Sequence, residues 1–489
     1  MNPDKTHDKN MEPGFPFFRK IGAKYVLTND CGNYAVVTEK EFSALRDGEL
    51  KKTSRAYKTL FKNDLLPGKT DADRMAARYR GKNRHLTVGP NLHIVIVTLR
   101  CNESCVYCHA GRGSMKKTSL DMSVETAKNV VDTIFQTTSP SITIEFQGGE
   151  PLANWDVVEF IVKYATEKNT TFKKSLTFSL VTNLSLMDEK KAEFLLDSGV
   201  LMCTSLDGPE DLHDLNRKCP GGSAYKKTVS WMKRINEGYA KRGVDTNLYH
   251  VDALLTVTKD SLKRPKEIID EYVRHGIKVI HLRPLNPMGF AVETWDRIGY
   301  TPSEFLRFYN ESLDYIIELN NKGTEILERM SSIFLTKILT ERDPNFLDIR
   351  SPCGAGIGQL AYNYDGTIFT CDEGRMVNQM GDDIFALGVA GSTGYKELVS
   401  HDTVKTIATA SCLDGLPMCE SCAYKPYCGV CPVINYLEQG DLFGQRPRSS
   451  RCAIHMGVMD RIFTLIATGG DDVLRIFGRW VTYRQRQAQ

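Results

Sequence analysis

Strand-like and helix-like segments alternate six times between residues 92 and 295, and this alternation limits the possible folds more than any other feature. The apolar runs are "LHIVIVTL", "SITIEF", "LTFSLVTN", "VLMCTSL", "VDALLTV" and "KVIHLRP". Alternation of this kind predicts parallel βαβ units with right-handed crossovers. Six units predict an α/β fold, an open and partial (β/α)6 barrel, with catalytic groups at the C-terminal ends of its strands.

Helical periodicity is clearest in "SVETAKNVVDTIFQTT", the segment after the first strand-like run. Ser123 is the expected N-cap, because its hydroxyl can accept a hydrogen bond from the first turn. The stripe expected to face the sheet consists of Val124, Ala127, Val131, Ile134 and Phe135.

Composition excludes several classes of protein. The 489 residues are 41% hydrophobic and 25% charged, as in a soluble globular enzyme. The formal charge of +3 gives no reason to expect nucleic acid as a partner, and no apolar run approaches the roughly 20 residues of a membrane span. The polar N-terminus lacks the apolar core of a secretory signal, so we expect a cytoplasmic protein. Reduced, clustered cysteines in that compartment are typical metal ligands.

Three cysteines follow the first strand directly. Cys101, Cys105 and Cys108 have the spacing C-x3-C-x2-C, which can bring three thiolates to one metal centre without a fourth ligand. Structural zinc requires four ligands, so zinc fits poorly, although His109 could complete such a site. An iron–sulfur cluster with three cysteines would leave one iron open to a small molecule.

The second strand-like run ends in "EFQGGEP". Gly148 and Gly149 would let the backbone approach a ligand closely, and Glu150 adds a carboxylate at the same strand end. Together with the cysteine triplet on the preceding loop, this segment resembles the radical S-adenosylmethionine (SAM) superfamily.

The resemblance implies that the triplet holds a [4Fe–4S] cluster whose fourth iron is chelated by the amino and carboxylate groups of SAM. It also implies that the Gly-Gly-Glu segment receives the methionine amino group, and that a reductant such as flavodoxin or ferredoxin supplies electrons. The remaining cofactor-binding residues that it implies are Tyr107, Asn183, Ser205, Asp207 and Arg217.

Two of these roles have simple structural alternatives. Asn183 and Asp207 follow strand-like runs and could merely cap the next helix. Arg217 could form a surface ion pair instead of contacting the SAM carboxylate.

Seven further cysteines lie in the last third of the chain, in a segment that resembles the SPASM extension of radical SAM peptide-modifying enzymes. The run "CESCAYKPYCGVC" has the spacing C-x2-C-x5-C-x2-C, whereas the usual pattern has three residues between the last pair. The resemblance implies two auxiliary Fe–S clusters; structural zinc is the alternative. One set is Cys419, Cys422, Cys428 and Cys452, and the other is Cys353, Cys371 and Cys431.

The second set has three cysteines, so its fourth position is open, filled by Cys412 or filled by another group. Asp372 follows Cys371, at the place where sulfatase-type maturases carry the base that deprotonates the substrate. Its alternative role is to accept backbone N–H bonds in a turn. Cys31, Cys203, Cys219 and Cys412 have no such spacing, and apart from that possible role of Cys412 they are expected to be incidental thiols.

Segments such as "TSLDGPEDLHDLNR" and "GAGIGQLAYNYDGTIFTCDEG" narrow the resemblance to the maturases of His-Xaa-Ser systems. That family implies an enzyme that cleaves SAM and abstracts hydrogen from a ribosomally made precursor peptide, alongside a second radical SAM maturase. The alternatives are a sulfatase-type maturase that acts on a Cys or Ser of a protein, and a non-catalytic Fe–S scaffold.

The expected organisation is a leader, a peptide-recognition unit, a barrel and a cluster-binding domain. A small α+β unit of winged-helix-like size precedes the barrel, and we expect it to add a peptide strand to its sheet. The expected boundaries are a flexible leader at 1–16, this unit at 17–67, a linker at 68–91, the barrel at 92–295, a helical bridge at 296–350, the SPASM domain at 351–460, and a C-terminal helix with a basic tail at 461–489.

Overall fold

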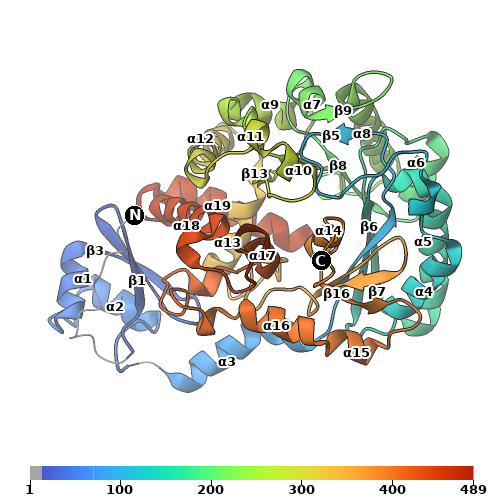
Figure 1. Ribbon diagram of the computed structural model, residues 1–489. Helices are drawn as coiled ribbons and strands as arrows, with labels where there is room; N and C mark the ends of the chain where they lie inside the picture. The colour runs from blue at the N-terminus through green and yellow to red at the C-terminus, as the bar shows by residue number, and fades with distance from the viewer. Residues whose placement is uncertain (1–13, 70, 488–489) are drawn as a thin grey trace.

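The structure is a computed structural model that describes residues 14–69 and 71–487 (Figure 1). Most of the expected leader, residues 1–13, lies outside this description, as do the side chains of the basic tail from residue 484 onward. The last part of the leader is packed: the Phe15 ring lies edge-on to Phe18 and Phe42, with centroids 6.2 Å apart in both pairs.

The N-terminal unit is a three-stranded antiparallel sheet followed by two helices. Thr38 begins the first helix with a capping box, in which its hydroxyl accepts from the Glu41 N–H and the Glu41 side chain accepts from the Thr38 N–H. Leu27, Phe42 and Leu60 form part of a separate small core. The elements are β1 (Phe17–Ile21), β2 (Lys24–Thr28), β3 (Tyr34–Thr38), α1 (Glu39–Arg46) and α2 (Arg55–Lys62).

The stretch expected to be a linker contains a helix, α3 (Ala72–Lys82), capped by the Asp71 side chain. No residue of α3 is buried, so the helix has no apolar stripe that the sequence pattern could reveal. A 3-10 turn, η1 (Arg84–Thr87), leads from it to the barrel.

The predicted partial barrel is confirmed: six strands pair in parallel in the order β12-β10-β8-β7-β6-β4. The sixth apolar run is split, because Val279–Ile280 (β11) pairs with Leu327–Glu328 (β13) while β12 joins the main sheet. The six strands are β4 (Leu92–Thr98), β6 (Ser141–Gly148), β7 (Ser175–Val181), β8 (Leu201–Ser205), β10 (Asp252–Thr256) and β12 (Leu282–Arg283).

Helices cover the outer face of this sheet, as Figure 1 shows for α4, α5 and α6. Ser123 caps α4 as predicted, through the Thr126 N–H. The predicted stripe is buried except for Val124, which is 49% exposed, and Val130 takes part in the core instead. The helices are α4 (Val124–Ile134), α5 (Trp155–Phe172), α6 (Glu189–Asp197), α7 (Glu210–Asn216), α8 (Ala224–Lys241) and α9 (Pro265–Arg274), and the 3-10 turns are η2 (Thr118–Leu120), η3 (Pro151–Asn154) and η4 (Ser261–Lys263).

The barrel sheet continues into the cysteine-rich region. Strand β14 (Gln359–Tyr362) pairs in parallel with β4, and β15 (Thr367–Phe369) and β16 (Ala386–Val389) extend the sheet in antiparallel fashion. The expected separate SPASM domain is therefore joined to the barrel by backbone hydrogen bonds.

Long helices cover the remaining side, and α12 packs on α18 while α13 packs on α19. Because α18 begins at Ser450, the expected boundary at residue 460 falls inside a helix. These elements are α10 (Phe290–Glu293), α11 (Trp295–Ile298), α12 (Pro302–Asn321), α13 (Arg329–Leu339), α14 (Asp372–Asn378), α15 (Tyr395–Val399), α16 (Asp402–Ala410), α17 (Pro432–Gln439), α18 (Ser450–Thr468) and α19 (Gly470–Gln487), with the 3-10 turns η5 (Leu413–Gly415), η6 (Lys425–Tyr427) and η7 (Arg446–Arg448).

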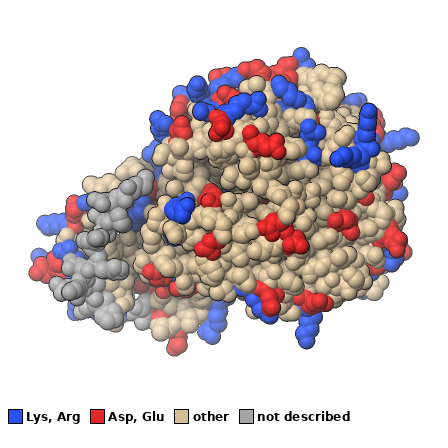
Figure 2. Space-filling model, viewed as in Figure 1, with Lys and Arg blue, Asp and Glu red and all other residues tan. Residues whose placement is uncertain are grey.

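The surface carries charges of both signs, interspersed over the face seen in Figure 2. Within the described part of the chain, no helix is both long enough and apolar enough to cross a membrane.

Candidate active site

The cysteine triplet lies on the loop that follows β4, at the C-terminal end of the barrel strands. Backbone hydrogen bonds fix this loop: the Cys101 N–H donates to Gly113 and the Cys108 N–H to Cys105. Cys105 belongs to a two-residue strand, β5 (Ser104–Cys105), that pairs with β9 (Arg217–Lys218). This pairing places Cys105 directly opposite Arg217.

The three thiols lie close enough to influence one another. Burial, followed by the charges of Glu150 and Cys105, raises the pKa of the Cys101 thiol. Burial also raises the pKa of Cys105; Arg217 opposes the shift and Cys108 adds to it. Buried neighbouring thiols resist loss of their protons. A metal centre supplies positive charge and therefore favours the thiolate form.

The donor set fits an Fe–S cluster better than a zinc ion. In the residues described, no three His, Cys, Asp or Glu side chains converge on a single metal-ion position. Cluster thiolates each bind a different iron and surround a larger space. The His109 ring lies among cations and not among the thiols. Burial, followed by the charges of Arg283 and Arg451, lowers the pKa of His109 to about 3.

The glycine pair packs against the cysteine loop. A Cβ on Gly148 would lie 2.2 Å from the carbonyl oxygen of Thr98, and one on Gly149 would lie 2.3 Å from that of Arg100. The Gly149 N–H donates to Thr98 and the Glu150 N–H donates to Arg100. Only glycine fits here, because β6 ends in direct contact with the backbone that leads into Cys101.

The Glu150 carboxylate ties the ends of two strands together. It accepts hydrogen bonds from the Leu152 N–H (3.0 Å), the Thr182 hydroxyl (2.6 Å) and the Asn183 N–H (2.8 Å). Burial raises the pKa of Glu150, and these three donors oppose the shift. A carboxylate has about four lone-pair sites, so one acceptor position is left for a ligand.

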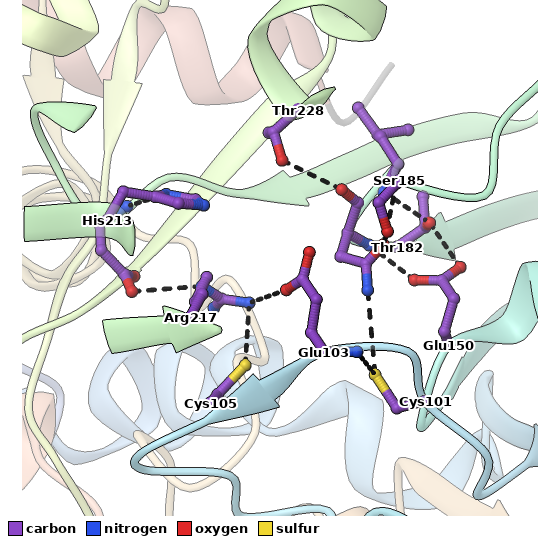
Figure 3. Close-up of polar contacts among 12 residues, drawn as sticks. Cys101, Glu103, Cys105, Glu150, Thr182, Ser185, His213, Arg217 and Thr228 are labelled. Carbon is purple, nitrogen blue, oxygen red and sulfur yellow. Dashed lines mark hydrogen bonds and ion pairs between the residues drawn. The ribbon is translucent and has the colours of Figure 1, made fainter. Parts of the chain in front are cut away.

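Asn183 lies at the triplet, and Figure 3 labels its neighbours Thr182 and Ser185. Its amide nitrogen donates to the Asn102 side chain at 3.2 Å and lies 3.8 Å from the Cys101 sulfur. Its side-chain oxygen accepts from the Ser185 N–H and hydroxyl. It does not cap α6, whose N-cap is Asp188, so the capping alternative is wrong for this residue.

Asp207 is fully buried and holds two side chains of the site. Its carboxylate accepts from the Tyr107 hydroxyl and, at 3.2 Å, from Arg217 Nε. Helix α7 has Pro209 as its N-cap residue and no side-chain cap, so the capping alternative is wrong here too. Ser205 ends β8 beside these groups and is partly exposed, without a side-chain hydrogen bond to any described residue.

Arg217 is a buried cation among negative groups, not a surface ion pair. Its guanidinium contacts Asp207, lies 3.6 Å from the Cys105 sulfur and 3.8 Å from Glu103, and stacks over the Tyr107 ring at 5.3 Å (Figure 3). The positive charge therefore stands beside the cysteine loop.

Glu103 is the residue that the sequence reading missed. Its side chain is 1% exposed, and neither carboxylate oxygen has a hydrogen-bond partner in the described residues. Burial raises its pKa to about 7, with Arg217 opposing the shift. A charged residue inside "CNESC" was the available signal.

The C-terminal cysteines influence one another's pKa in two sets. The pKa of the Cys428 thiol is raised first by burial and then by the charges of Cys422, Cys452 and Cys419. The pKa of the Cys371 thiol is raised first by burial and then by the charges of Glu373, Cys353 and Cys431. The charge of Cys412 acts on Tyr79, and the hydroxyl of the preceding Ser411 accepts a hydrogen bond from the Cys353 N–H at 2.9 Å.

Asp372 follows the ligand candidate Cys371 on α14 and is buried. It accepts from Arg375 Nε at 2.8 Å, and Arg375 also donates to the Ala110 carbonyl beside the first cysteine loop. No backbone N–H of the turn donates to the Asp372 side chain, so that alternative is wrong.

Similar proteins point to one superfamily. Residues 95–301 match the model of the Radical SAM superfamily. A cysteine-type anaerobic sulfatase-maturating enzyme of Clostridium perfringens is 25% identical over 283 residues, which cover 56% of this chain and 71% of that enzyme. The first curated relatives are matched over 63% and 71% of their own length.

Two solved structures show the same fold. Native anSMEcpe with bound AdoMet and Kp18Cys peptide has a TM-score of 0.64 at 20% identity, and the match covers 80% of this chain and 100% of that one. Streptococcus suis SuiB bound to precursor peptide SuiA has a TM-score of 0.54 at 13% identity, with 90% and 99% covered. The family match, the shared fold and the three-thiol loop after β4 agree with one another. This chain carries a radical SAM domain.

Proposed function

We propose that the protein is a radical SAM maturase that abstracts hydrogen from a ribosomally made precursor peptide, as in His-Xaa-Ser systems. The observation that carries the proposal is the arrangement of Cys101, Cys105 and Cys108 on one loop, with the glycine pair packed against that loop. When bound, a [4Fe–4S] cluster and SAM supply the radical chemistry, the reductive cleavage of SAM to methionine and a 5′-deoxyadenosyl radical.

The chain's own residues would bind and orient SAM beside the cluster. Arg217, fixed by Asp207, provides a cation for the carboxylate of SAM. The Gly148–Gly149 backbone and the remaining acceptor position of Glu150 suit its amino group. Asn183 and Ser205, at two neighbouring strand ends, suit the ribose hydroxyls.

Tyr107 would hold Asp207 and Arg217 in position. Its hydroxyl donates to Asp207, and its ring lies under Arg217. It is 4% exposed, so it also keeps water from the buried ion pair.

The C-terminal cysteines would hold two auxiliary clusters. Cys419, Cys422, Cys428 and Cys452 provide four thiolates for one of them. Cys353, Cys371 and Cys431 provide three for the other. Electrons would come from a flavodoxin or ferredoxin, and a second radical SAM maturase is the expected partner enzyme.

The N-terminal unit would bind the precursor peptide along β3. A groove of about 910 Å³ runs between β3, α3 and the ends of α13 and α18. The outer edge of β3 pairs with no strand in the described residues. The Tyr34 carbonyl accepts from Asn63 and the Thr38 N–H donates to Glu41, so the backbone groups of Tyr34, Val36 and Thr38 face away from β2. The N–H and C=O of Val36 that face away from β2 have no hydrogen-bond partner in the described residues, so an added strand could pair with them.

Charge in this groove favours an acidic peptide. Arg74 and Arg78 are already paired with Asp64. The Lys82 ammonium, in contrast, has no ion-pair partner in the described residues and stands at the wall of the groove. A carboxylate of the peptide would satisfy it.

A sulfatase-type maturase is the second candidate, with Asp372 as the base for a Cys or Ser substrate. The similarity to the Clostridium perfringens enzyme and the place of Asp372 after Cys371 favour it.

Deuterium transfer separates the two candidates. Hydrogen abstraction moves a substrate hydrogen into 5′-deoxyadenosine, so a deuterated precursor peptide with His-Xaa-Ser repeats should give deuterated 5′-deoxyadenosine. A cysteine-containing sulfatase peptide, tested in parallel, should give neither label transfer nor aldehyde. Aldehyde from that peptide, with no transfer from the precursor, would establish the sulfatase-type reaction instead.

A further inference from the structure

We propose that Glu145, on the inner face of the barrel, binds a basic side chain of the substrate, and that this side chain is the histidine of the precursor peptide's repeat. The inference rests on the proposed function and names the part of the peptide that enters the barrel. This basic residue is distinct from the acidic segment proposed for the β3 groove.

One face of the barrel strands around Glu145 is sealed by the outer helices. Ile144 and Phe146 of β6 are buried in the main core, together with Phe178 and Leu180 of β7. Side chains alternate between the two faces of a strand. The residues between these core positions, Glu145 among them, therefore face the interior of the partial barrel.

The interior face of the barrel is polar and open. The residues that alternate with the core on β6, β7 and β8 are partly exposed, and they include Thr143, Glu145, Gln147, Ser179, Cys203 and Ser205. The interior of a closed (β/α)8 barrel is instead packed with branched apolar side chains. The partial barrel of this protein therefore leaves a polar space in which a peptide side chain can lie.

Two neighbouring side chains hold the Glu145 carboxylate in place. Its Oε2 accepts from the hydroxyl of Ser179, the residue paired with Glu145 across β6 and β7, at 2.8 Å. Its Oε1 accepts from Gln147 Nε2 at 2.5 Å. A carboxylate has about four lone-pair sites, so two remain beyond the bonds made by the described residues. Because the carboxylate is already ordered, a ligand gains these sites at little entropic cost.

The negative charge of Glu145 has no positive partner. Both of its donors are neutral, and no Lys, Arg or His of the described residues forms an ion pair with it. Asp252, a second carboxylate on the interior face, has the His250 ring at 3.4 Å. The guanidinium of Arg329 stacks over the Phe346 ring, 5.5 Å from its centroid. What Glu145 lacks is therefore a cation and not another hydroxyl.

Cys203 shows that Glu145 faces the shared interior. Burial raises the pKa of the Cys203 thiol, the charges of Asp252 and Glu145 add to the shift, and Arg329 opposes it. Asp252 is the register partner of Cys203 on the neighbouring strand β10. Glu145 acts on the same thiol from β6, on the other side of β7. The carboxylate is therefore accessible to a ligand that enters between these strands.

The position of Glu145 suits a histidine whose neighbours reach the catalytic loop. Glu145 lies three residues before Gly148 on the same strand, which corresponds to about 10 Å along β6. An imidazole donates an N–H to a carboxylate whether it is neutral or protonated. A nearby carboxylate also favours the protonated form, which supplies the missing charge. A histidine held here would place the adjoining residues of the peptide toward the strand ends.

The test is a double-mutant cycle on the reconstituted holoenzyme with SAM. Fluorescence anisotropy measures the affinity for the labelled precursor peptide and for a peptide in which glutamine replaces the histidines of the repeat. Glu145→Gln keeps the size of the side chain and an acceptor for Ser179, but it removes the charge. We expect this variant to bind the precursor about 10–100-fold more weakly than wild type does.

The glutamine peptide should lose a similar amount of affinity for wild type, and the two changes together should cost no more than either alone. A lysine peptide keeps the positive charge, so wild type should bind it more tightly than the glutamine peptide. This comparison needs no protein variant. Wild type that binds all three peptides equally, or losses that add in the cycle, would overturn the proposal.

Thr143→Val is the matched control, because Thr143 lies on the same face of β6 and carries no charge. It should leave the affinity for each peptide unchanged, and both variants should keep the iron content and the peptide-independent SAM cleavage of wild type. Wild type that cleaves SAM but does not bind the precursor would refute the proposed function together with this inference. Precursor binding without coupling between Glu145 and the histidine would refute the inference alone.

Discussion

At the scale of single residues, the position of the cysteine loop depends on backbone contacts as much as on the cysteines. A Cβ on Gly149 would lie 2.3 Å from the carbonyl oxygen of Arg100 and 2.5 Å from that of Leu99, and the Glu150 N–H donates to the Arg100 carbonyl. The strand end that carries Glu150 and the loop that carries Cys101 are therefore one packed unit.

Gly149→Ala should disturb this unit. Its Cβ would lie 2.3 Å from a backbone oxygen that cannot rotate away, so we expect a loss of about 1–3 kcal/mol in unfolding free energy. Urea unfolding and iron content after reconstitution measure the two effects. Gly478→Ala, on the exposed face of α19 with nothing within 4 Å, is the control. It should raise the unfolding free energy by about 0.5–1 kcal/mol, because alanine favours a helix interior over glycine, and it should leave the iron content unchanged. Wild-type stability and iron loading in Gly149→Ala would contradict this account.

Asp372→Asn tests the proposed base. Asparagine preserves the size of the side chain and an acceptor for Arg375, but it cannot take a proton. We expect normal iron content, normal 5′-deoxyadenosine and product formation reduced by about 10²–10⁴-fold. Chromatography of the cofactor products and mass spectrometry of the peptide provide these readouts. If the variant modifies the peptide fully, Asp372 only positions Arg375.

The sequence points to Cys101, Cys105 and Cys108 because their spacing is local, whereas the two C-terminal sets follow only from the resemblance to the SPASM extension. It does not predict what Asp207 does, since Tyr107 and Arg217 reach it from distant segments. Glu103 was overlooked because its burial beside Arg217 arises only when β5 pairs with β9.

At the scale of elements, β3 combines an unpaired edge with a groove. Neither follows from the apolar alternation of the strand. The sequence predicts a small α+β unit here, but the exposed helix α3, which forms one wall of the groove, has no buried residue to reveal it.

Val36→Pro should weaken binding of the precursor peptide. Proline removes the N–H of Val36, which faces away from β2, and therefore preserves the pairing of β2 with β3. Fluorescence anisotropy with a labelled precursor peptide measures the affinity, and Val36→Ala, which keeps the N–H, is the control. SAM cleavage without peptide should be unchanged in both. Equal affinity in the proline variant and wild type would exclude strand addition at β3.

Peptide affinity should also depend on pH through Lys82. Burial lowers the pKa of Lys82 from 10.5 to about 8, so its charge is present below that pH and is lost above it. Affinity for an acidic peptide should therefore fall between about pH 7 and pH 9. Lys82→Arg stays charged over this range and should give a flatter profile. Identical profiles would show that Lys82 does not contact the peptide.

At the scale of the whole molecule, the barrel and the cysteine-rich region share one sheet. Strand β14 pairs with β4, the strand that leads into the catalytic loop, and Arg375 on α14 reaches the Ala110 carbonyl. The alternation of apolar runs predicts the six barrel strands, because each run is local. The pairing of residues 359–362 with 92–95 is not local, so the sequence pattern does not reveal that the cysteine-rich segment extends the barrel sheet.

The N-terminal unit is joined to the same body through its first strand and a turn. Arg19 forms two hydrogen bonds with Asp460 on α18, at 2.6 and 2.7 Å, and Tyr427 donates to the Gly32 carbonyl at 2.9 Å. A peptide held at β3 would therefore be held by the same rigid assembly that carries the cysteine clusters.

The most direct measurement is anaerobic SAM cleavage by reconstituted protein with dithionite, compared with the variant in which Cys101, Cys105 and Cys108 are all alanine. Wild type should form 5′-deoxyadenosine. The variant should lose about four irons per chain, retain the iron bound by the C-terminal cysteines and form no 5′-deoxyadenosine. Normal SAM cleavage by the variant, or no cleavage by fully loaded wild type, would contradict the account.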